Sequence, residues 1–310
     1  MTVSTGLSPA PAPRGVGDTP FGFLVLDKPA GLTSHDCVSR VRRAYGLRRV
    51  GHGGTLDPAV TGVLPIALGP ATRLLPYLSG GKSYRGVIQL GVRTASDDLQ
   101  GEVLERQNVP RLHAAGLEQA LGPFRGEILQ RPPQVSAVHV DGERAHVRAR
   151  RGEALELAER QVTIEALELL GWDPATGQLE LHIDCSAGTY IRSLARDLGQ
   201  TLGCGGALAS LRRTAALGFR LDQACGLEAL QGQPLPPLRD PLEVLGHLPQ
   251  RLLREDEWPS WRCGRRLPDD TGAAAEQAVV ILDPDGALAG LARSDGAGQL
   301  QPRLVLDPAG

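Results

Sequence analysis

Lysine is almost absent from the chain. Of the 33 basic residues only Lys28 and Lys82 are lysine, and the others are arginine. Guanidinium groups bind phosphate through paired hydrogen bonds and stack on bases, although a GC-rich genome produces the same enrichment. No stretch approaches the roughly 20 apolar residues that a membrane span requires, and the N-terminus has no apolar signal-peptide core. We therefore expect no membrane association and a cytoplasmic location.

Cysteine pairs are missing too. The five cysteines, an odd number without a C-x-x-C spacing, are Cys37, Cys185, Cys204, Cys225 and Cys263. This pattern argues against a disulfide framework and a zinc site, and it predicts reduced, mostly buried thiols.

Nucleotide and metal motifs are incomplete or absent. The stretch GGKS at 80–83 lacks the first glycine of a phosphate-binding loop, because Pro76 stands in its place. The loop that begins at Gly51 has Leu56 where a G-x-G-x-x-G motif needs its third glycine. No G-x-S-x-G, H-E-x-x-H or paired-aspartate metal motif occurs, so we expect neither a metal nor a cofactor.

The charge is unevenly distributed along the 310 residues. Residues 1–220 hold 25 basic against 21 acidic residues, a net charge of +4, whereas residues 221–310 hold 8 against 14, a net charge of −6. The positive charge that phosphate attracts therefore lies with the first part of the chain. In the acidic last part, an RNA contact would have to use a small local patch such as Arg262, Arg265 and Arg266.

The pattern of elements predicts a mixed α/β or α+β core. We expect a disordered tail over residues 1–20, a main domain over 21–245 with an insertion at about 128–153, and a small β domain over 250–310. The alternation of Leu179, Leu181 and Ile183 predicts a strand, followed by a helix from about Thr189 to Gly203. The proline-rich segment 231–246 is typical of a linker.

A helix before the first glycine-rich loop carries a run of arginines. Ser34 can cap this helix, Val38 and Val41 recur at helical spacing, and Gly46 can end it. The run is either a solvated helix face or a phosphate-binding surface, and both interpretations stay open. Its members are Arg40, Arg42 and Arg43 in the helix, and Arg48 and Arg49 in the loop that follows it.

Asp57 stands in the glycine-rich stretch GHGGTLDPAV. Asp-Pro begins many turns, and four other copies occur in this chain, so the dipeptide alone carries little information. Its setting is more informative, because Gly51, Gly53 and Gly54 allow the backbone a close approach to a ligand and Pro58 keeps Asp57 out of a helix. Asp57 is either a turn former or the functional residue of the loop.

Several motifs resemble the TruB family of pseudouridine synthases, in the family's order. They are FLVLDKPAGLTSHD, GHGGTLDPAVTGVLPIALGPATRL, KSYRGVIQLGVRTASDDLQG, CSAGTYIRSLARDLGQTLG and LRRTAALGF. Together they cover most of residues 21–220, and the last 60 or so residues resemble the family's PUA domain only loosely. The resemblance implies an α+β catalytic domain built on a central, mainly antiparallel sheet, with a small β-rich PUA-like domain after it.

The family resemblance also implies the reaction. It predicts a monomeric, cofactor-free enzyme without an obligate protein partner that isomerises a uridine in the T-loop of tRNA, at position 55. Asp57 would be the nucleophile, attacking C1′ of the ribose or C6 of the uracil or serving a route through a glycal. Arg192 would keep that carboxylate ionised, and Tyr84 would stack on the flipped uracil and move the proton of carbon 5.

Further residues match family positions around the uracil. Tyr190 and Leu211 would line its pocket, His52 would fill the space that the base vacates, and Lys28 would lie near the site. The arginine run and the insertion, with Arg148 and Arg151, would contact the RNA backbone.

The chain departs from the family pattern at Gly53, Val135 and His146, which puts the contacts of the insertion in question. Two rivals stay open: a guide-RNA-dependent synthase, and a non-catalytic RNA-binding or RNA-folding protein on the same scaffold.

Overall fold

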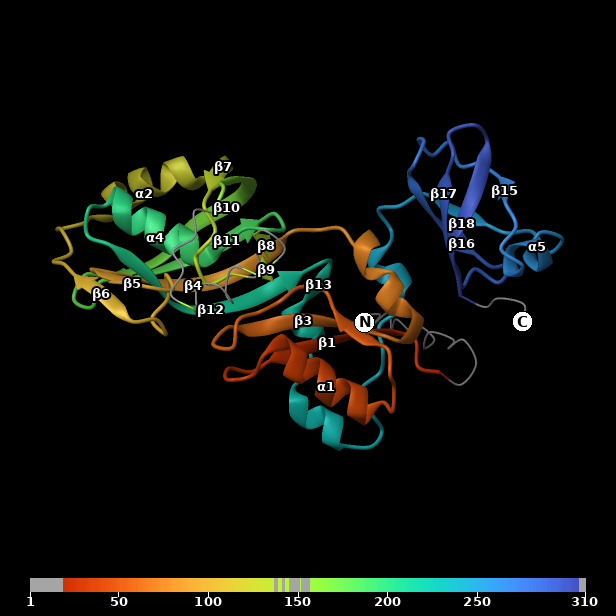
Figure 1. The fold of residues 1–310 in the computed structure, drawn as a ribbon, viewed down its shortest axis with the longest axis horizontal. Helices are drawn as coiled ribbons and strands as arrows, with labels where there is room; N and C mark the ends of the chain where they lie inside the picture. The colour runs from red at the N-terminus through yellow and green to blue at the C-terminus, as the bar shows by residue number, and fades with distance from the viewer. Residues whose placement is uncertain (1–18, 137–138, 141–142, 145–150, 152–156, 307–310) are drawn as a thin grey trace, which may run out of the picture. The chain divides into compact units, whose positions relative to one another are not determined.

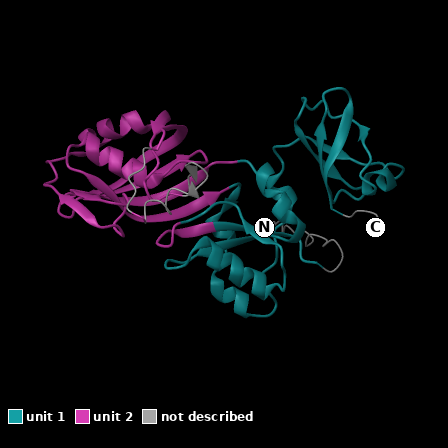
Figure 2. Cartoon of the chain, in the orientation of Figure 1, with its two compact units in different colours: residues 1–56, 64–79, 217–310 teal, residues 57–63, 80–216 magenta. Residues whose placement is uncertain are grey.

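The computed structural model describes residues 19–136, 139–140, 143–144, 151 and 157–306. The chain forms two compact units (Figure 2). Unit 2 consists of Asp57–Val63 and Gly80–Ala216, and unit 1 consists of the described parts of 1–56, 64–79 and 217–310.

Unit 2 is built on an antiparallel sheet. Along the sheet, β12 pairs with β4, β4 with β11, β11 with β10, and β10 with β7, all antiparallel. On the other edge of β12, Arg212 and Arg213 pair in parallel with Thr61 and Gly62 of β3. The bounds are β3 Thr61–Leu68, β4 Lys82–Leu90, β7 Gly126–Gln130, β10 Arg160–Asp173, β11 Gln178–Cys185 and β12 Gly206–Ala216.

Two helices pack on this sheet (Figure 1). α4 (Ile191–Thr201) lies on β12 and β4, and α2 (Ala114–Leu121) lies against α4 and β10. The smaller elements of the unit are η3 Gly122–Phe124, β5 Val92–Thr94, β6 Val103–Arg106, β8 His139–Val140 and β9 Glu143–Arg144.

The hydrophobic pattern of unit 2 agrees with the sequence prediction. Leu179, Leu181 and Ile183 of β11 are fully buried on one face of the sheet, as their alternation predicts. Leu194 and Leu198 are buried on one face of α4. The insertion predicted at about 128–153 begins inside β7, because Ile128 pairs with Val162 of β10. The other boundaries of the predicted domains stay predictions.

In unit 1, α1 (Ser34–Ala44) begins one residue earlier than a Ser34 cap would require. Thr33 is the N-cap, since its hydroxyl accepts a hydrogen bond from Asp36 N at 3.0 Å and the Asp36 carboxylate accepts one from Thr33 N at 2.9 Å. The Ser34 hydroxyl instead accepts from Leu56 N at 2.8 Å and donates to Leu56 O at 3.1 Å. Our prediction that Ser34 caps the helix was therefore wrong, because this buried hydroxyl fixes the residue before Asp57.

The remaining elements of unit 1 include two strands beside the second half of β3. β2 (Val50–His52) is antiparallel to β3, and β1 (Gly22–Lys28) is its neighbour. The short elements are β13 Phe219–Arg220, η1 Gly69–Arg73, η2 Leu75–Tyr77, η4 Leu221–Gln223, η5 Leu227–Gln231 and η6 Pro241–Val244.

The segment predicted as a linker, 231–246, is packed. Arg239 exchanges two backbone hydrogen bonds with Phe23 of β1, of 3.0 and 2.7 Å, and Leu245 is fully buried. The hydroxyl of Tyr45 donates to Pro236 O at 2.5 Å. The prediction of a linker was wrong, because a proline-rich segment outside a sheet can still pack against the rest of the protein.

The last part of the chain is a five-stranded sheet, as predicted for a β-rich C-terminal domain. Its order is β14-β16-β17-β18-β15, and it packs around Trp261, which is fully buried and donates its indole N–H to Ala289 O at 3.2 Å. The bounds are β14 Gln250–Leu252, α5 Trp258–Arg262, β15 Leu267–Pro268, β16 Ala278–Leu282, β17 Leu288–Ser294 and β18 Gln299–Val305.

Candidate active site

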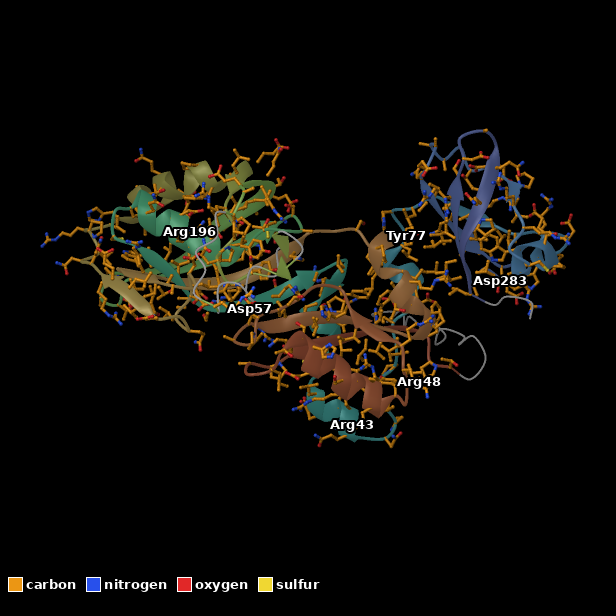
Figure 3. The ribbon with its side chains drawn as sticks, viewed as in Figure 1. Arg43, Arg48, Asp57, Tyr77, Arg196 and Asp283 are labelled. Atoms are coloured by element: carbon orange, nitrogen blue, oxygen red, sulfur yellow. The ribbon has the colours of Figure 1, made fainter. Side chains whose placement is uncertain are left out.

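Asp57 and Arg192 form an ion pair in unit 2. Asp57 Oδ2 lies 3.0 Å from Arg192 Nη2, although 134 positions separate the two residues. The Asp57 side chain is 46% exposed, whereas that of Arg192 is 9% exposed. Asp57 lies at the surface of the unit, where it is labelled in Figure 3. A half-exposed carboxylate is therefore paired with a guanidinium that the protein has largely desolvated.

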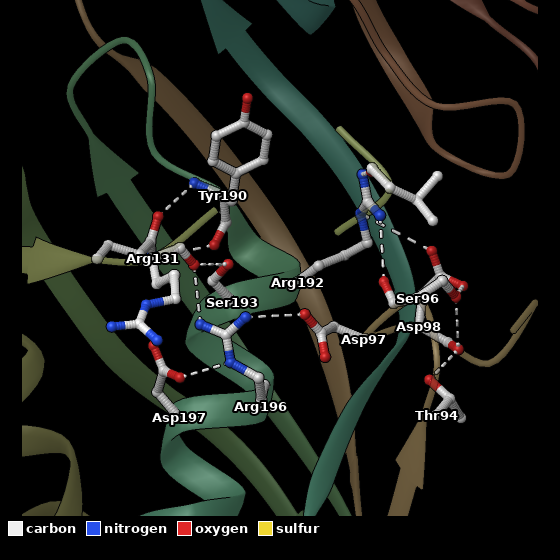
Figure 4. A network of polar contacts seen from close by, with 12 residues as sticks. Thr94, Ser96, Asp97, Asp98, Arg131, Tyr190, Arg192, Ser193, Arg196 and Asp197 are labelled. Atoms are coloured by element: carbon white, nitrogen blue, oxygen red, sulfur yellow. Dashed lines mark hydrogen bonds and ion pairs between the residues drawn. The ribbon is translucent and has the colours of Figure 1, made fainter. Parts of the chain in front are cut away.

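The Arg192 guanidinium is held by three further oxygen atoms. Nη1 donates to Ser96 O at 3.1 Å, Nη2 donates to Val135 O at 3.0 Å, and Nε lies 3.8 Å from Asp98 Oδ2 (Figure 4). Arg192 is the second residue of α4, where the positive end of the helix dipole disfavours a cation. The two carboxylates and two carbonyls offset that penalty and fix the direction of the guanidinium.

Gln130 fixes the backbone just before α4. Its side-chain amide accepts from Tyr190 N at 2.8 Å and donates to Tyr190 O at 3.1 Å. Gln130 is the last residue of β7 and is only 2% exposed. The sheet edge thus positions the start of α4, and with it Arg192.

A second charged cluster lies one helical turn farther along α4. Arg196 donates to Asp97 Oδ2 at 3.0 Å, to Asp197 Oδ1 at 2.7 Å and to Arg131 O at 2.9 Å (Figure 4). Burial raises the pKa of Asp97, and the nearby Arg196 opposes that rise. Asp97 has a φ of 61°, which is unusual outside glycine and requires surrounding contacts. The cluster therefore secures the turn that presents Ser96 and Asp98 to Arg192.

Tyr84 lies on the central strand of unit 2 and is 6% exposed. In the sheet it stands opposite Ile183 of β11 and Arg213 of β12. Burial is the main cause that raises the pKa of Tyr84, and the negative charge of Asp57 adds to the rise, so the carboxylate acts on this hydroxyl. The phenol is protonated near neutral pH.

Leu211 lies on β12, and Tyr190 is the residue before α4. Leu211 stands opposite Gly86, where a Cβ would lie 3.1 Å from Leu211 Cδ1, so the glycine makes room for this side chain. Tyr190 is half-buried; burial is the main cause that raises its pKa, while Asp57 contributes to the rise and Arg192 opposes it. Unit 2 therefore contains Asp57, Tyr84, Tyr190, Arg192 and Leu211.

Other predicted residues belong to unit 1. Lys28 is fully buried, and its ammonium group donates to Pro29 O at 2.9 Å. His52 ends β2 and is half-buried, and its Nδ1 accepts from Gly54 N at 3.2 Å, which places its ring proton on Nε2. The positions of Lys28 and His52 relative to unit 2 stay predictions.

The predicted RNA-contacting arginines are mostly at the surface. Arg40, Arg43, Arg48 and Arg49 are exposed, and Arg42 is half-buried. Figure 3 labels Arg43 and Arg48. Arg151 is exposed, whereas Arg148 and His146 lie outside the described residues. In the C-terminal sheet domain, the Arg262 guanidinium lies 5.9 Å from the centre of the Trp258 ring, while Arg265 and Arg266 are exposed.

Comparison with known proteins identifies the family. Residues 42–191 match the model of the TruB family pseudouridylate synthase (N terminal domain), and residues 192–235 match the tRNA pseudouridylate synthase B C-terminal domain. The chain belongs to the TruB family of pseudouridine synthases.

Curated relatives match the TruB assignment over nearly the whole chain. A "tRNA pseudouridine synthase B" of Parasynechococcus marenigrum (strain WH8102) is 64% identical over 94% of this chain and 100% of its own length. One of Synechococcus sp. (strain WH7803) is 61% identical over 94% of this chain and 99% of its own.

Solved structures support the TruB fold independently. The structure entitled "Crystal Structure of a Cbf5-Nop10-Gar1 Complex" aligns with a TM-score of 0.71 at 24% identity, covering 98% of this chain and 92% of the other. The structure "Structure of H/ACA RNP bound to a substrate RNA containing 2'-deoxyuridine" gives the same TM-score at 23% identity, covering 98% and 92%. At these identities the likeness concerns the fold.

Three parts of this TruB site escaped the sequence analysis. They are the Asp97–Asp98 turn, Arg196 and the buried Arg213. The turn lies in a motif that resembles the family, yet no sequence feature ties Asp98 to Arg192. Arg213 does leave a signal, because it is two residues after Leu211 and therefore lies on the same face of the strand as that half-buried apolar side chain.

Neither a membrane span nor a metal cluster is found in the part of the chain that the structure describes. None of the helices there is long and apolar enough to cross a bilayer. The same residues contain no group of three metal-binding side chains.

Proposed function

We propose that this chain isomerises a uridine in the T-loop of tRNA, at position 55, to pseudouridine, with Asp57 as the nucleophile. Family membership and the names of the full-length relatives support pseudouridylation of tRNA. The observation that carries the assignment of the nucleophile is the Asp57–Arg192 ion pair, in which a solvent-accessible carboxylate meets a fixed guanidinium.

Asp57 suits a nucleophile because its carboxylate is half-exposed and its ion pair with the fixed Arg192 guanidinium holds it in one direction. The reaction breaks the bond between N1 and C1′ and forms one between C5 and C1′. One proton leaves carbon 5 and one is taken up at N1, so no oxidant or cofactor is needed. Attack at C1′, attack at C6 and a route through a glycal all use the same carboxylate at the same place.

The uridine must leave its stack to reach Asp57, which costs a few kcal/mol. Tyr84 supplies an aromatic face for the extruded uracil, and Tyr190 and Leu211 supply walls. His52 fills the space left in the RNA, and Lys28 lies near the base. Aromatic stacking on a flipped base recovers part of the extrusion cost.

Tyr84 also serves the proton transfer. Its hydroxyl lies within the electrostatic influence of Asp57 and keeps its proton near neutral pH. A hydroxyl in that state can exchange protons with carbon 5 once the base is rejoined through that atom.

The tRNA is bound mainly by arginine. The exposed groups of Arg40, Arg43, Arg48 and Arg49 contact the phosphate backbone together with Arg42, and Arg148 and Arg151 act from the insertion. The catalytic domain spans residues 21–245 and the PUA-like domain 250–310. The enzyme is a cytoplasmic monomer without an obligate protein partner or cofactor.

The guide-RNA-dependent alternative rests on the fold alone. The solved relatives with a TM-score of 0.71 include a Cbf5-Nop10-Gar1 complex, but they share only 23–24% identity. The relatives at 61–64% identity cover 94% of this chain and are named for tRNA, which favours the stand-alone enzyme. A non-catalytic RNA-binding protein would gain nothing from placing an ionised carboxylate beside phosphate.

The test is tritium release from 5-tritiated uridine in an unmodified tRNA transcript, with purified protein and no additions. We expect release at one T-loop uridine by the native chain and none by Asp57→Asn, which keeps the shape and removes the charge. Binding of tRNA by the variant should stay within about tenfold, since Asp57 is one of many contacts.

A matched control uses another Asp-Pro turn of unit 2. Asp173 ends β10, and its carboxylate accepts hydrogen bonds from Ala175 N and Thr176 Oγ1. Asp173→Asn should release tritium at the native rate. Loss of tRNA binding equal to the loss of activity in Asp57→Asn would refute the nucleophile assignment, and absence of release by the native chain would favour a guide-dependent enzyme.

A further inference from the structure

Arg213 is a fully buried arginine at the centre of unit 2. It lies on β12 directly opposite Tyr84 of β4, and its other neighbour in the sheet is Gly62 of β3. A Cβ at Gly62 would lie 2.1 Å from Arg213 O, so only glycine allows β3 to approach this closely. A cation in such a place is costly to bury unless its donors meet fixed acceptors.

The Arg213 guanidinium has two acceptors of different kinds. Nε donates to Val63 O at 2.7 Å, a backbone atom of the adjacent strand. The guanidinium also makes a side-chain hydrogen bond with the Tyr84 hydroxyl. Because a guanidinium has donors only, the Tyr84 oxygen must be the acceptor in this bond. The hydroxyl proton of Tyr84 therefore points away from Arg213.

We propose that Arg213 is a positioning residue for the reaction, which fixes the Tyr84 hydroxyl with its oxygen toward the guanidinium and its proton toward the substrate side. The proposal rests on the role of Tyr84 given above. Arg213 does not touch the substrate and acts through Tyr84. Its hydrogen bond to Val63 O holds the guanidinium in a fixed position relative to the Tyr84 hydroxyl.

The charged groups around the Tyr84 hydroxyl come from several elements. Lys82 is two residues earlier on β4, Cys185 lies on β11, and Asp57 lies in the loop before β3. Burial raises the pKa of Tyr84, with smaller rises from Cys185 and Asp57, and Arg213 opposes them. Replacing Arg213 by a neutral side chain should therefore raise the pKa of Tyr84 further and weaken its ability to carry negative charge during proton transfer.

The first test needs no tRNA and no turnover. The chain contains four tyrosines, so the ring carbons that bear the hydroxyls can be followed separately by NMR after labelling with ¹³C-tyrosine. The Tyr84 resonance is assigned by its loss in Tyr84→Phe. We expect this resonance to titrate at higher pH in Arg213→Gln than in the native chain, and an unchanged titration would overturn the proposal.

The control for this test is Arg212→Gln. Arg212 precedes Arg213 on β12 but lies on the opposite face, where it stands across from the exposed Arg85 and donates to Thr61 Oγ1 at 3.2 Å. We expect the Tyr84 titration of this variant to match that of the native chain.

The second test separates positioning from support of the fold. Arg213→Gln should lower the turnover number about tenfold or more in the native background, with the Kd for tRNA within about threefold. In the Tyr84→Phe background the same substitution should lower the remaining turnover less than about twofold, because the group through which it acts is gone. Equal losses in both backgrounds would indicate a structural role only.

A third measurement leaves Arg213 in place, in case Arg213→Gln does not fold. The Nη–H protons of a guanidinium that bonds to Tyr84 exchange slowly with water. We expect the resonances of one buried arginine to shift and exchange faster in Tyr84→Phe. Unchanged arginine spectra would overturn the proposal, whereas a failure of the tritium assay with these spectra intact would count against the proposed function instead.

Discussion

Gly199 of α4 and Gly206 of β12 are in backbone contact. A Cβ at Gly199 would lie 2.1 Å from Gly206 N, and one at Gly206 would lie 2.4 Å from Ala195 O. This close packing sets the height of α4 above the sheet. Because Arg192 lies two helical turns before Gly199, the same contact sets where its guanidinium stands.

We predict that Gly199→Ala lowers the free energy of unfolding by about 1–3 kcal/mol, the usual cost of overpacking, and lowers turnover because α4 is displaced. Gly116→Ala is the matched control, since Gly116 lies inside α2 with no atom within 4 Å of an added Cβ. That change should stabilise by about 0.5–1 kcal/mol. Urea denaturation measures the free energy of unfolding of both variants. Equal free energies for Gly199→Ala and Gly116→Ala would contradict the packing argument.

Arg192→Lys keeps the positive charge but loses the planar set of donors. A single ammonium group cannot replace the bonds to Ser96 O and Val135 O together with the ion pair to Asp57. We expect tritium release to fall at least about 100-fold, with the Kd for tRNA changed less than about threefold.

Arg85→Lys serves as the control for Arg192→Lys. Arg85 is an exposed arginine of β4 that pairs with Glu180. Its substitution should leave the rate within about twofold, because exposed ion pairs contribute little. A similar loss in both variants would contradict the special role of the buried guanidinium.

Lys82 should make stability depend on pH in the alkaline range. Burial lowers the pKa of Lys82, and the nearby Arg213 adds to this effect. Below its folded-state pKa the protein bears the cost of a buried ammonium group. As pH rises from there toward 10.5, the ordinary pKa of a lysine, the unfolded chain holds more protons than the folded chain, so this contribution to stability increases.

The test compares Lys82→Met with the native chain. The variant should be the more stable protein at pH 7, and its advantage should shrink as pH approaches 10. Midpoints of urea unfolding at pH 7, 8, 9 and 10 measure the difference. A constant or growing advantage would mean that the lysine is not desolvated in the folded protein.

The C-terminal sheet contains a buried ion pair whose loss should be local. Arg251 is 5% exposed and donates to Glu257 Oε1 at 2.7 Å and to Asp270 Oδ1 at 2.7 Å. Arg251→Met should cost about 3 kcal/mol, because Glu257 stays buried with fewer partners. Asp270→Asn, at a side chain that is 66% exposed, should cost less than about 1 kcal/mol.

Unfolding of this part of the chain is followed by the fluorescence of Trp261, the fully buried tryptophan of α5 that packs against the C-terminal sheet. We expect its unfolding midpoint to fall in Arg251→Met while tritium release at 25 °C is unchanged. If tritium release is lost in Arg251→Met when the C-terminal sheet unfolds, the C-terminal part and the catalytic domain unfold as one.

Periodicity predicted the regular elements well and the irregular polar ones poorly. The alternation around Leu181 and the helix that contains Arg192 follow from apolar spacing, which is a local property of the chain. The capping role of Ser34 was wrong because Thr33 can serve equally, and only the distant Leu56 decides between them. The packing of 231–246 was missed because prolines mark both linkers and covering segments.

In the candidate site, too, the residues in local motifs were predicted and the residues that depend on distant contacts were missed. Asp57 and Arg192 were named as partners from the family motifs, but no local pattern of the chain pairs residues more than a hundred positions apart. The Asp97 turn and Arg213 were missed because their roles depend on which strand and helix meet, which composition does not encode. An arginine on the buried face of a strand is the one signal that an attentive search could use.

The unequal exposure of Asp57 and Arg192 decides which partner of the pair can move. In the routes where Asp57 attacks C1′ or C6, the carboxylate becomes part of a covalent ester, loses its negative charge and leaves the guanidinium without its nearest anion. Arg192 does not follow, because Ser96 and Val135 still accept its hydrogen bonds and the Asp98 carboxylate still lies 3.8 Å away. The Arg192 guanidinium therefore keeps its position, and the Asp57 carboxylate pairs with it again after each turnover.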